Sequence, residues 1–350
     1  MTYDSRGRPL RMAFPDGVTG TNTHDGTDNL TRRQYSDGTD YQFTYDALNR
    51  LVSANGLAFT YDAEGRLTNT ASSGVNYAAT YDAGGRLTSV RYHNGAFTVN
   101  YSYDTRSRLT GVSDTLTGTS VTFAYDDAGR LTGLTRPNGV NGAYTYDAAG
   151  RLTRLQEGAV VDLQFTFDAA RQITSVNHTA PLNPAGLHAP NAQTHTYDAA
   201  HQINSPGHAY DARGRQTAAP GHSFQWDGAS RLQQIDSVTL AYDGADNLQT
   251  RTAGGVTVRY FYQHAIGLAP ILAERNETAG QMQRYYVWTP GGRLLYAIER
   301  RDVAAAEQIL PAARRIETAE DVEQRGLAGT ARSHQRDDLA RLHAQAHPAQ

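Results

Sequence analysis

The chain lacks two residue types entirely, and both absences limit what it can do. Among its 350 residues there is no cysteine, so disulfide bonds, thiolate metal ligands and a cysteine nucleophile are excluded. There is also no lysine, and the 32 basic residues, all arginine, nearly balance the 35 acidic ones to a net charge of −3. A chain this close to neutral presents no large basic face, so we expect neither nucleic acid nor an anionic membrane surface as a partner.

Long apolar runs and glutamate are also scarce. No stretch approaches the ~20 apolar residues that cross a bilayer, so we expect no membrane span. The first residues, Met1-Thr2-Tyr3-Asp4, do not have the charged and apolar segments of a signal peptide. Before residue 301 the chain has 22 aspartates but only 5 glutamates. Only the short aspartate side chain bonds to the backbone that directly follows it, so this bias favours turns.

An aromatic residue or histidine followed by aspartate recurs thirteen times, and Tyr146-Asp147-Ala148-Ala149-Gly150-Arg151-Leu152-Thr153 is the clearest copy. Over much of the chain neighbouring copies lie 20 to 22 residues apart, a fixed period that indicates a repeat architecture. The residues that we predict to be structural anchors of the repeats are Tyr45, Asp46, Tyr61, Asp62, Tyr81, Asp82, Tyr103, Asp104, Tyr125, Asp126, Tyr146, Asp147, Gly150, Arg151 and Leu152.

Each copy predicts a β-hairpin. Asp147 followed three residues later by Gly150 is typical of a type I turn closed by a left-handed glycine. Before the turn, residues alternate between aromatic and threonine, as in Tyr144-Thr145-Tyr146, which indicates a strand with one aromatic face. A leucine or isoleucine follows the turn in most copies and starts a second strand.

Arginine often lies four residues after the turn aspartate, as Arg151 lies after Asp147. One interpretation is a solvated ion pair that contributes roughly 0–1 kcal/mol. The other is a ladder of guanidinium groups stacked along the array.

These repeats strongly resemble the YD repeat of the RHS-repeat family, which includes bacterial polymorphic-toxin shells, the C subunit of insecticidal toxin complexes and the animal teneurins. The resemblance covers roughly residues 1–298. It implies an all-β spiral array of antiparallel hairpins that forms a hollow shell. In the family such a shell encloses a C-terminal polypeptide or presents an adhesive surface. The family's core-associated region and self-cleavage site do not appear here, so the resemblance is partial.

The copies also predict how the chain is divided. Residues 1–255 are the repeat array, interrupted by a proline-rich loop insertion at 177–196. Residues 256–298 are expected to form strands and a hairpin that resemble the lead-in to the RHS core region. The composition changes at residue 299, where aromatic residues end, and we expect 299–350 to be a short helical or disordered tail.

No motif indicates catalysis. Six histidines lie within 45 residues, namely His178, His188, His195, His201, His208 and His222. None of them is paired at tight metal-ligand spacing, and half-buried or polar histidines are the simpler interpretation. Turn formation already accounts for the aspartates. We therefore predict no catalytic, cofactor-binding or metal-binding residue, no cofactor and no enzyme activity.

The predicted function is a structural scaffold, part of a shell that encapsulates or displays a polypeptide in toxin delivery or intercellular competition. Its expected partners are other RHS/YD-repeat segments or an encapsulated C-terminal polypeptide. The alternatives are an adhesion module that binds a glycan or a cell-surface partner, toxin activity in residues 299–350, and a truncated gene remnant. The resemblance implies secretion or cell-surface display as part of a larger protein.

Overall fold

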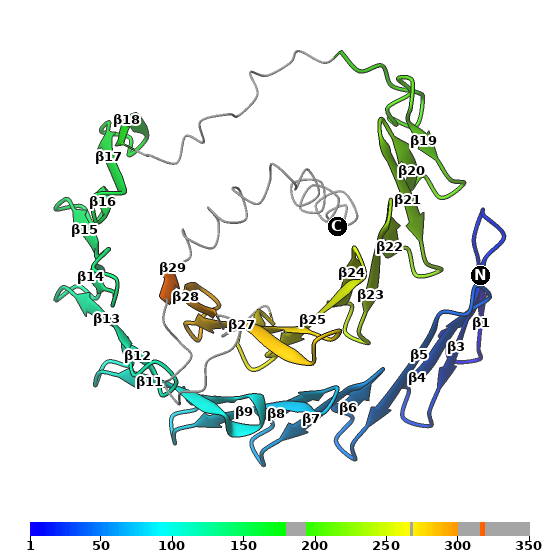
Figure 1. Cartoon of the computed structure of the whole chain (residues 1–350), viewed down its shortest axis with the longest axis horizontal. Helices are drawn as coiled ribbons and strands as arrows, with labels where there is room; N and C mark the ends of the chain where they lie inside the picture. Colours follow the sequence, from blue (N-terminus) through cyan, green and yellow to red (C-terminus); the bar gives the residue numbers. More distant parts are fainter. Residues whose placement is uncertain (180–193, 267–268, 300–315, 319–350) are drawn as a thin grey trace. The chain divides into compact units, whose positions relative to one another are not determined.

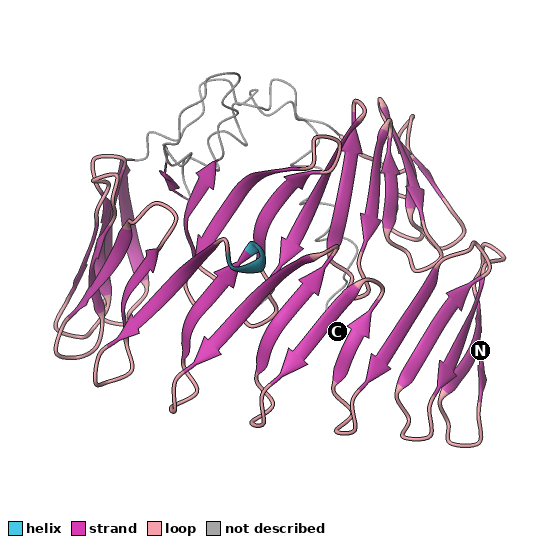
Figure 2. Cartoon of the chain, turned by 60° about the horizontal axis from the view of Figure 1, so that its bottom comes forward, coloured by secondary structure: helices cyan, strands magenta, loops and turns pink. Residues whose placement is uncertain are grey.

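A computed structural model describes residues 1–179, 194–266, 269–299 and 316–318 of the chain. These residues form antiparallel strands with almost no helix, apart from a short 3-10 turn, η1, at His93–Gly95. Figure 2 shows the strands and the short connections between them. In the described part, no helix has the length and apolar character needed to span a bilayer. The all-β fold predicted from the alternating residues is confirmed.

The strands belong to two antiparallel sheets, and within each sheet a strand pairs with its neighbours along the chain (Figure 1). The first sheet contains β1 (Thr2–Tyr3), β2 (Pro9–Ala13), β3 (Thr19–His24), β4 (Leu30–Tyr35), β5 (Asp40–Tyr45), β6 (Leu51–Ala54), β7 (Leu57–Tyr61), β8 (Leu67–Ser72), β9 (Val75–Tyr81), β10 (Leu87–Tyr92), β11 (Phe97–Tyr103), β12 (Leu109–Asp114), β13 (Ser120–Tyr125), β14 (Leu131–Thr135), β15 (Gly142–Tyr146), β16 (Leu152–Glu157), β17 (Val161–Phe167) and β18 (Ile173–Thr179).

The second sheet is built in the same way from the later repeats. It contains β19 (Ala209–Tyr210), β20 (Gln216–Ala219), β21 (His222–Trp226), β22 (Leu232–Ile235), β23 (Val238–Tyr242), β24 (Leu248–Ala253), β25 (Val256–Tyr262), β26 (Ile271–Asn276), β27 (Gln281–Trp288), β28 (Leu294–Glu299) and β29 (Ile316–Thr318).

In the hairpins that a repeat turn closes, the register shifts at the aromatic residue that precedes the turn. In the β15–β16 hairpin, Thr145 pairs with Arg154, whereas the next residue, Tyr146, pairs with Leu152. The shift marks a β-bulge, which the left-handed Gly150 closes. A bulge in this position adds local twist and turns the tyrosine ring out of the regular alternation.

The chain divides into two compact units, and each contains strands of both sheets. Unit 1 comprises residues 1–78, 189–265 and 269–283, and unit 2 the remainder. In both units some of the residues two positions before a turn tyrosine are buried, such as Phe59 in unit 1 and Tyr101 in unit 2, both 6% exposed. Phe59 packs with Ala54 and Leu57 in one apolar cluster. Alternation along the strands thus places one aromatic face in the core.

Three predicted regions differ in how far the structure describes them. Most of the predicted insertion at 177–196 lies outside the described residues, and its first three residues, 177–179, continue β18 by pairing with β17. Within 256–298 the expected strands are present as β25 to β28. Of the expected helical or disordered tail at 299–350, residue 299 ends β28 and Ile316–Thr318 form β29, a short strand paired with β28. The rest of the tail lies outside the described residues.

Candidate functional site: the repeat turn and the links between repeats

Each repeat turn is closed by its own aspartate. The Asp147 carboxylate accepts hydrogen bonds from the backbone N–H of Arg151 at 2.9 Å and from its Nε at 2.6 Å. The backbone N–H of Asp147 donates to the carbonyl of Arg151, and that of Gly150 donates to the carbonyl of Asp147. Gly150 has a φ of 80°, which glycine adopts without the strain that a Cβ would bring. The turn therefore satisfies its backbone and its carboxylate together.

The other predicted anchors occupy equivalent positions. The aspartates that accept hydrogen bonds from both the backbone N–H and the guanidinium of the arginine four residues later are Asp46, Asp62, Asp82, Asp104, Asp126 and Asp147. The aromatic residues that end the incoming strands are Tyr45, Tyr61, Tyr81, Tyr103, Tyr125 and Tyr146. Leu152 begins the outgoing strand of its hairpin.

These hydrogen bonds lower the pKa of the turn carboxyls. In the repeat of Asp147, the backbone N–H of Arg151 is the largest cause that lowers the aspartate pKa, followed by its side chain. In the repeat of Asp25, asparagine replaces arginine, and hydrogen bonds led by the Asn29 amide lower the pKa to about 2. The carboxylates are thus held in their charged form by donors within the turn.

Successive repeats are joined through arginine and tyrosine. The guanidinium carbon of Arg108 lies 4.8 Å from the centroid of the Tyr125 ring in the next repeat. Its Nη1 donates to the carbonyl of Asp126 at 3.1 Å. In return, the Tyr125 hydroxyl donates to the carbonyl of Leu109 at 2.9 Å. These two repeats are therefore held together by a cation–π contact and two hydrogen bonds to the backbone.

We call this arrangement the Arg–Tyr link. Pairs in which the guanidinium carbon lies 4.7–4.8 Å from the next ring centroid are Arg50 with Tyr61, Arg86 with Tyr103, Arg108 with Tyr125, Arg130 with Tyr146, and Arg151 with Phe167. Their tyrosine hydroxyls donate to Leu51, Leu87, Leu109 and Leu131. Phe167 has no hydroxyl, so its link lacks that bond.

The arginines are not simply solvated partners of their aspartates. The side chains of Arg108 and Arg151 are only 26% and 29% exposed, and each guanidinium contacts three groups in two repeats. The geometry is closer to the ladder than to the isolated ion pair. It differs from the expected ladder because each guanidinium stacks on an aromatic ring rather than on another guanidinium.

A second set of contacts joins the two sheets within unit 1. The turn Pro15-Asp16-Gly17 lies at the opposite end of a hairpin from the repeat turns. Asp16 forms an ion pair with Arg213 of the second sheet, with 2.8 Å between Oδ2 and Nε. The Arg213 guanidinium carbon also lies 3.8 Å from the centroid of the Phe14 ring. The repeat pattern did not predict Asp16, because it includes only aspartates preceded by an aromatic residue or histidine. The Pro-Asp-Gly triplet is the signal that would have located this turn.

In unit 2 the two sheets meet through buried tyrosines. The Tyr296 hydroxyl of β28 donates to the Asp114 carboxylate of β12 at 2.6 Å, where Asp114 is 3% exposed. Thr117 and Thr119 donate to the same carboxylate. The Tyr92 hydroxyl donates to the carbonyl of Tyr286 at 2.8 Å. These polar groups are buried as hydrogen-bonded pairs, as a stable interior requires.

The clustered histidines do not converge. The rings of His195 and His208 lie 6.0 Å apart, and His222 pairs with Asp236 at 2.8 Å. His178 is exposed on β18, and His188 lies outside the described residues. Among the residues with described positions, no group of three or more histidines and carboxylates could hold a metal ion.

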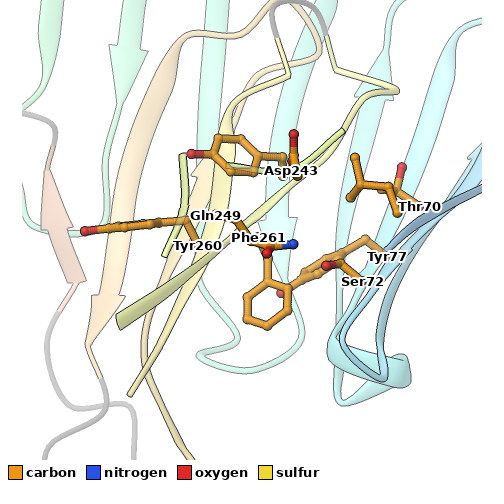
Figure 3. Close-up of a pocket in the computed structure, with 9 residues that line it drawn as sticks. Thr70, Ser72, Tyr77, Asp243, Gln249, Tyr260 and Phe261 are labelled. Carbon is orange, nitrogen blue, oxygen red and sulfur yellow. The ribbon is translucent and has the colours of Figure 1, made fainter. Parts of the chain in front are cut away.

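Figure 3 shows a cavity in unit 1 lined by residues such as Tyr77, Asp243 and Phe261. Its volume of 10 Å³ is about that of one water-sized sphere, which is too small for a substrate.

Comparisons with known proteins agree with this geometry. A family model described as Teneurin YD-shell matches residues 1–127, and one described as RHS Repeat matches residues 125–159. The crystal structure of TcdB2-TccC3-TEV has a similar fold, with a TM-score of 0.59 and 15% identity over 89% of this chain and 22% of that chain. For TcdB2-TccC3 without hypervariable C-terminal region, the TM-score is 0.52 and the identity 14%, over 85% of this chain and 23% of that chain.

The chain thus spans less than a quarter of the length of these two chains. A comparison with curated proteins gives no match. The two family models match residues 1–159, and the turns of later repeats have the same design, so the chain contains RHS/YD repeats.

Proposed function

We propose that the chain is a non-catalytic section of a toxin-associated β-shell that encloses a polypeptide. The observation that supports this proposal most strongly is that the aromatic residues of the turns contact neighbouring repeats. In the Arg–Tyr links a guanidinium of the preceding repeat stacks on the tyrosine ring, and the tyrosine hydroxyl donates to a backbone carbonyl. Groups used in this way hold the wall together and are not available to a ligand.

The same observation disfavours the adhesion module. Glycan-binding surfaces stack sugars on exposed aromatic rings, but of the described aromatic residues only Tyr3 and Tyr197 are strongly exposed, at 56% and 59%. The turn carboxylates are likewise occupied by donors of their own turns. A surface whose polar and aromatic groups are already paired suits a wall better than a binding face.

The similarity to TcdB2-TccC3 supports the enclosing role. One of the matched structures is of TcdB2-TccC3 without a hypervariable C-terminal region, so that protein carries a variable segment at its C-terminus. We propose that this chain, as part of a longer protein that is secreted or displayed at the cell surface, surrounds a comparable C-terminal polypeptide. The alternative of toxin activity in residues 299–350 lies almost entirely outside the described residues.

Protease accessibility tests enclosure. A flexible peptide with a protease recognition site is appended after Gln350 of the full chain, either directly or through a Gly/Ser linker of about 60 residues, which behaves as a random coil. If the wall shields the peptide attached to its C-terminus, the directly attached site is cut at least about tenfold more slowly than the site on the long linker. Equal cleavage rates would contradict enclosure while leaving the fold unaffected.

A further inference from the structure

Two turns of the second sheet in unit 1 carry an unusual residue after their aspartate. Most repeats have alanine there, as in Asp147-Ala148, but Gly228 follows Asp227 and Gly244 follows Asp243. Neither glycine has a positive φ, so backbone conformation does not explain them.

Close approach to the first sheet does explain them. A Cβ at Gly228 would lie 2.8 Å from the Cβ of Tyr35 and 2.8 Å from Asp37 Oδ1. A Cβ at Gly244 would lie 2.6–2.7 Å from the carbonyl carbon and oxygen of Ala54. Both spacings are shorter than van der Waals contact allows, so any side chain would push the turn away from the first sheet.

Other contacts hold the same turns in place. The backbone N–H of Gly228 donates to Asp37 Oδ2 at 2.5 Å. The guanidinium carbon of Arg231 lies 4.6 Å from the centroid of Tyr41 in the first sheet and 4.8 Å from that of Tyr242 in its own sheet. In other repeats the equivalent arginine links two repeats of one sheet. Arg231 links two repeats and also the two sheets.

The neighbouring turn shows what happens without the glycine. Asp211 is followed by Ala212, and this turn reaches the first sheet through the long side chain of Arg213, which contacts Asp16. The arginine side chain reaches the first sheet over a longer distance than the direct backbone contact of Gly228. Gly26 after Asp25 is the opposite case, because a Cβ there would meet nothing within 4 Å.

We infer that the surface formed by Tyr35, Asp37, Tyr41 and Ala54 is a docking surface for YD turns that carry glycine directly after the aspartate. Its occupants in this chain are the turns of Gly228 and Gly244. The carboxylate of Asp37 recognises the bare amide of the turn, and the ring of Tyr41 recognises its arginine. A turn with alanine in the same place is excluded by contact with the backbone and with Cβ atoms. This docking sets which repeats of the two sheets lie together in unit 1.

Hydrogen–deuterium exchange of the full chain tests the inference. We expect Gly228→Ala and Gly244→Ala to increase exchange at least about tenfold in residues 35–54 and 222–247, because the docked segments open locally. Strands β11 to β16 of unit 2 should keep the protection of the wild-type chain. Gly26→Ala is the matched control at the same turn position and should exchange like the wild type. Wild-type exchange in both docking variants, or equal loss in Gly26→Ala, would overturn the inference.

A second variant keeps the test decisive if the alanine variants do not fold. Asp37→Ala removes the acceptor of the Gly228 amide without adding bulk, and we expect faster exchange in residues 222–247. Asp37 also accepts the N–H of Thr39 in its own turn, so Asn138→Ala serves as control, because Asn138 accepts the N–H of Val140 in an equivalent turn of unit 2. Unchanged exchange of 222–247 in Asp37→Ala, or the same change in Asn138→Ala, would overturn the docking role of Asp37.

Discussion

The hydroxyl of Tyr125 donates to the backbone carbonyl of Leu109, 2.9 Å away and 16 residues earlier in the chain. The guanidinium of Arg108, the residue directly before Leu109, stacks on the same ring. One tyrosine thus contacts both the side chain and the main chain of the preceding repeat. The hairpins of the Arg–Tyr links stack on their neighbours through such contacts. The stability of a repeat array depends on these interfaces.

Removing the hydroxyl should weaken one interface selectively. We expect Tyr125→Phe to lower the free energy of unfolding by about 1 kcal/mol, since it leaves the partly buried carbonyl of Leu109 without this donor. The ring and its cation–π contact remain. Urea denaturation measures the change, and a variant as stable as the wild type would show that the hydroxyl contributes nothing.

The chain offers the reverse experiment at Phe167. The guanidinium of Arg151 stacks on this ring as that of Arg108 stacks on Tyr125, but the ring of Phe167 has no hydroxyl. We expect Phe167→Tyr to raise the free energy of unfolding by about 0.5–1 kcal/mol, because the new hydroxyl can donate to the carbonyl of Leu152 in the preceding hairpin. Destabilisation in the same denaturation assay would contradict the prediction.

The arginine of the link should not tolerate lysine. We expect Arg108→Lys to cost about 1–2 kcal/mol of unfolding free energy, because an ammonium group cannot bind the carboxylate, stack on the ring and reach the next carbonyl at once. The control is Arg32→Lys, which changes a cross-strand pair with Asp40 whose arginine is 44% exposed. Equal losses in the two variants would show that the link adds nothing to an ordinary surface pair.

Acid should destabilise the repeats. The pKa of turn carboxyls such as Asp46, Asp104 and Asp147 lies below its ordinary value, and that of Asp25 is about 2. A group with a lowered folded-state pKa contributes stability above its unfolded pKa and loses it as the pH falls through the folded value. We therefore expect the unfolding free energy to fall between about pH 4 and pH 2.

Asp147→Asn provides the control for this pH dependence. The variant should lose less stability than the wild type between about pH 4 and pH 2, because one titrating group is gone. Asp243 should act in the opposite direction, because burial raises its pKa. Its contribution to stability is lost as the pH rises through its folded value. An unfolding free energy that does not change below pH 4 would contradict the role given to the turn carboxylates.

The buried pair of Tyr296 and Asp114 gives a prediction for unit 2. Tyr296→Phe removes a donor from a carboxylate that is 3% exposed, and we expect a loss of about 1.5–3 kcal/mol. Thr117 and Thr119 still donate to this carboxylate, so the loss should stay below that of an isolated buried charge. Measurement of the unfolding free energy checks this, and a loss below that of Tyr125→Phe would contradict it.

The hairpins could be predicted from the sequence because their causes are local. Alternation before Tyr146 and the spacing of Asp147 and Gly150 determine a strand and a turn within eight residues. The Arg–Tyr link could not be predicted, because Arg108 meets the ring of Tyr125 only through the stagger of neighbouring hairpins. That stagger depends on the bulge and the twist of the sheet, which no single repeat reveals.

The contacts between the two sheets are harder to predict from the sequence than those between successive repeats. Asp16 and Arg213 are about two hundred residues apart, and neither belongs to the repeat signature. The glycine in Asp227-Gly228 is visible in the sequence, but its meaning depends on how closely Tyr35 approaches in the folded unit. A repeat pattern predicts the contacts that each copy makes with the next and not those between distant copies.

A double-mutant cycle on Arg108 and Tyr125 tests most directly whether successive repeats are held together by these links. The cycle combines Arg108→Ala and Tyr125→Leu and measures the unfolding free energy of both single variants and the double variant. We expect a coupling energy of about 0.5–1.5 kcal/mol for this pair. Arg108 paired with Tyr146, one repeat further along, should couple by less than about 0.5 kcal/mol. Equal coupling for the two pairs, or none for Arg108 with Tyr125, would contradict the account.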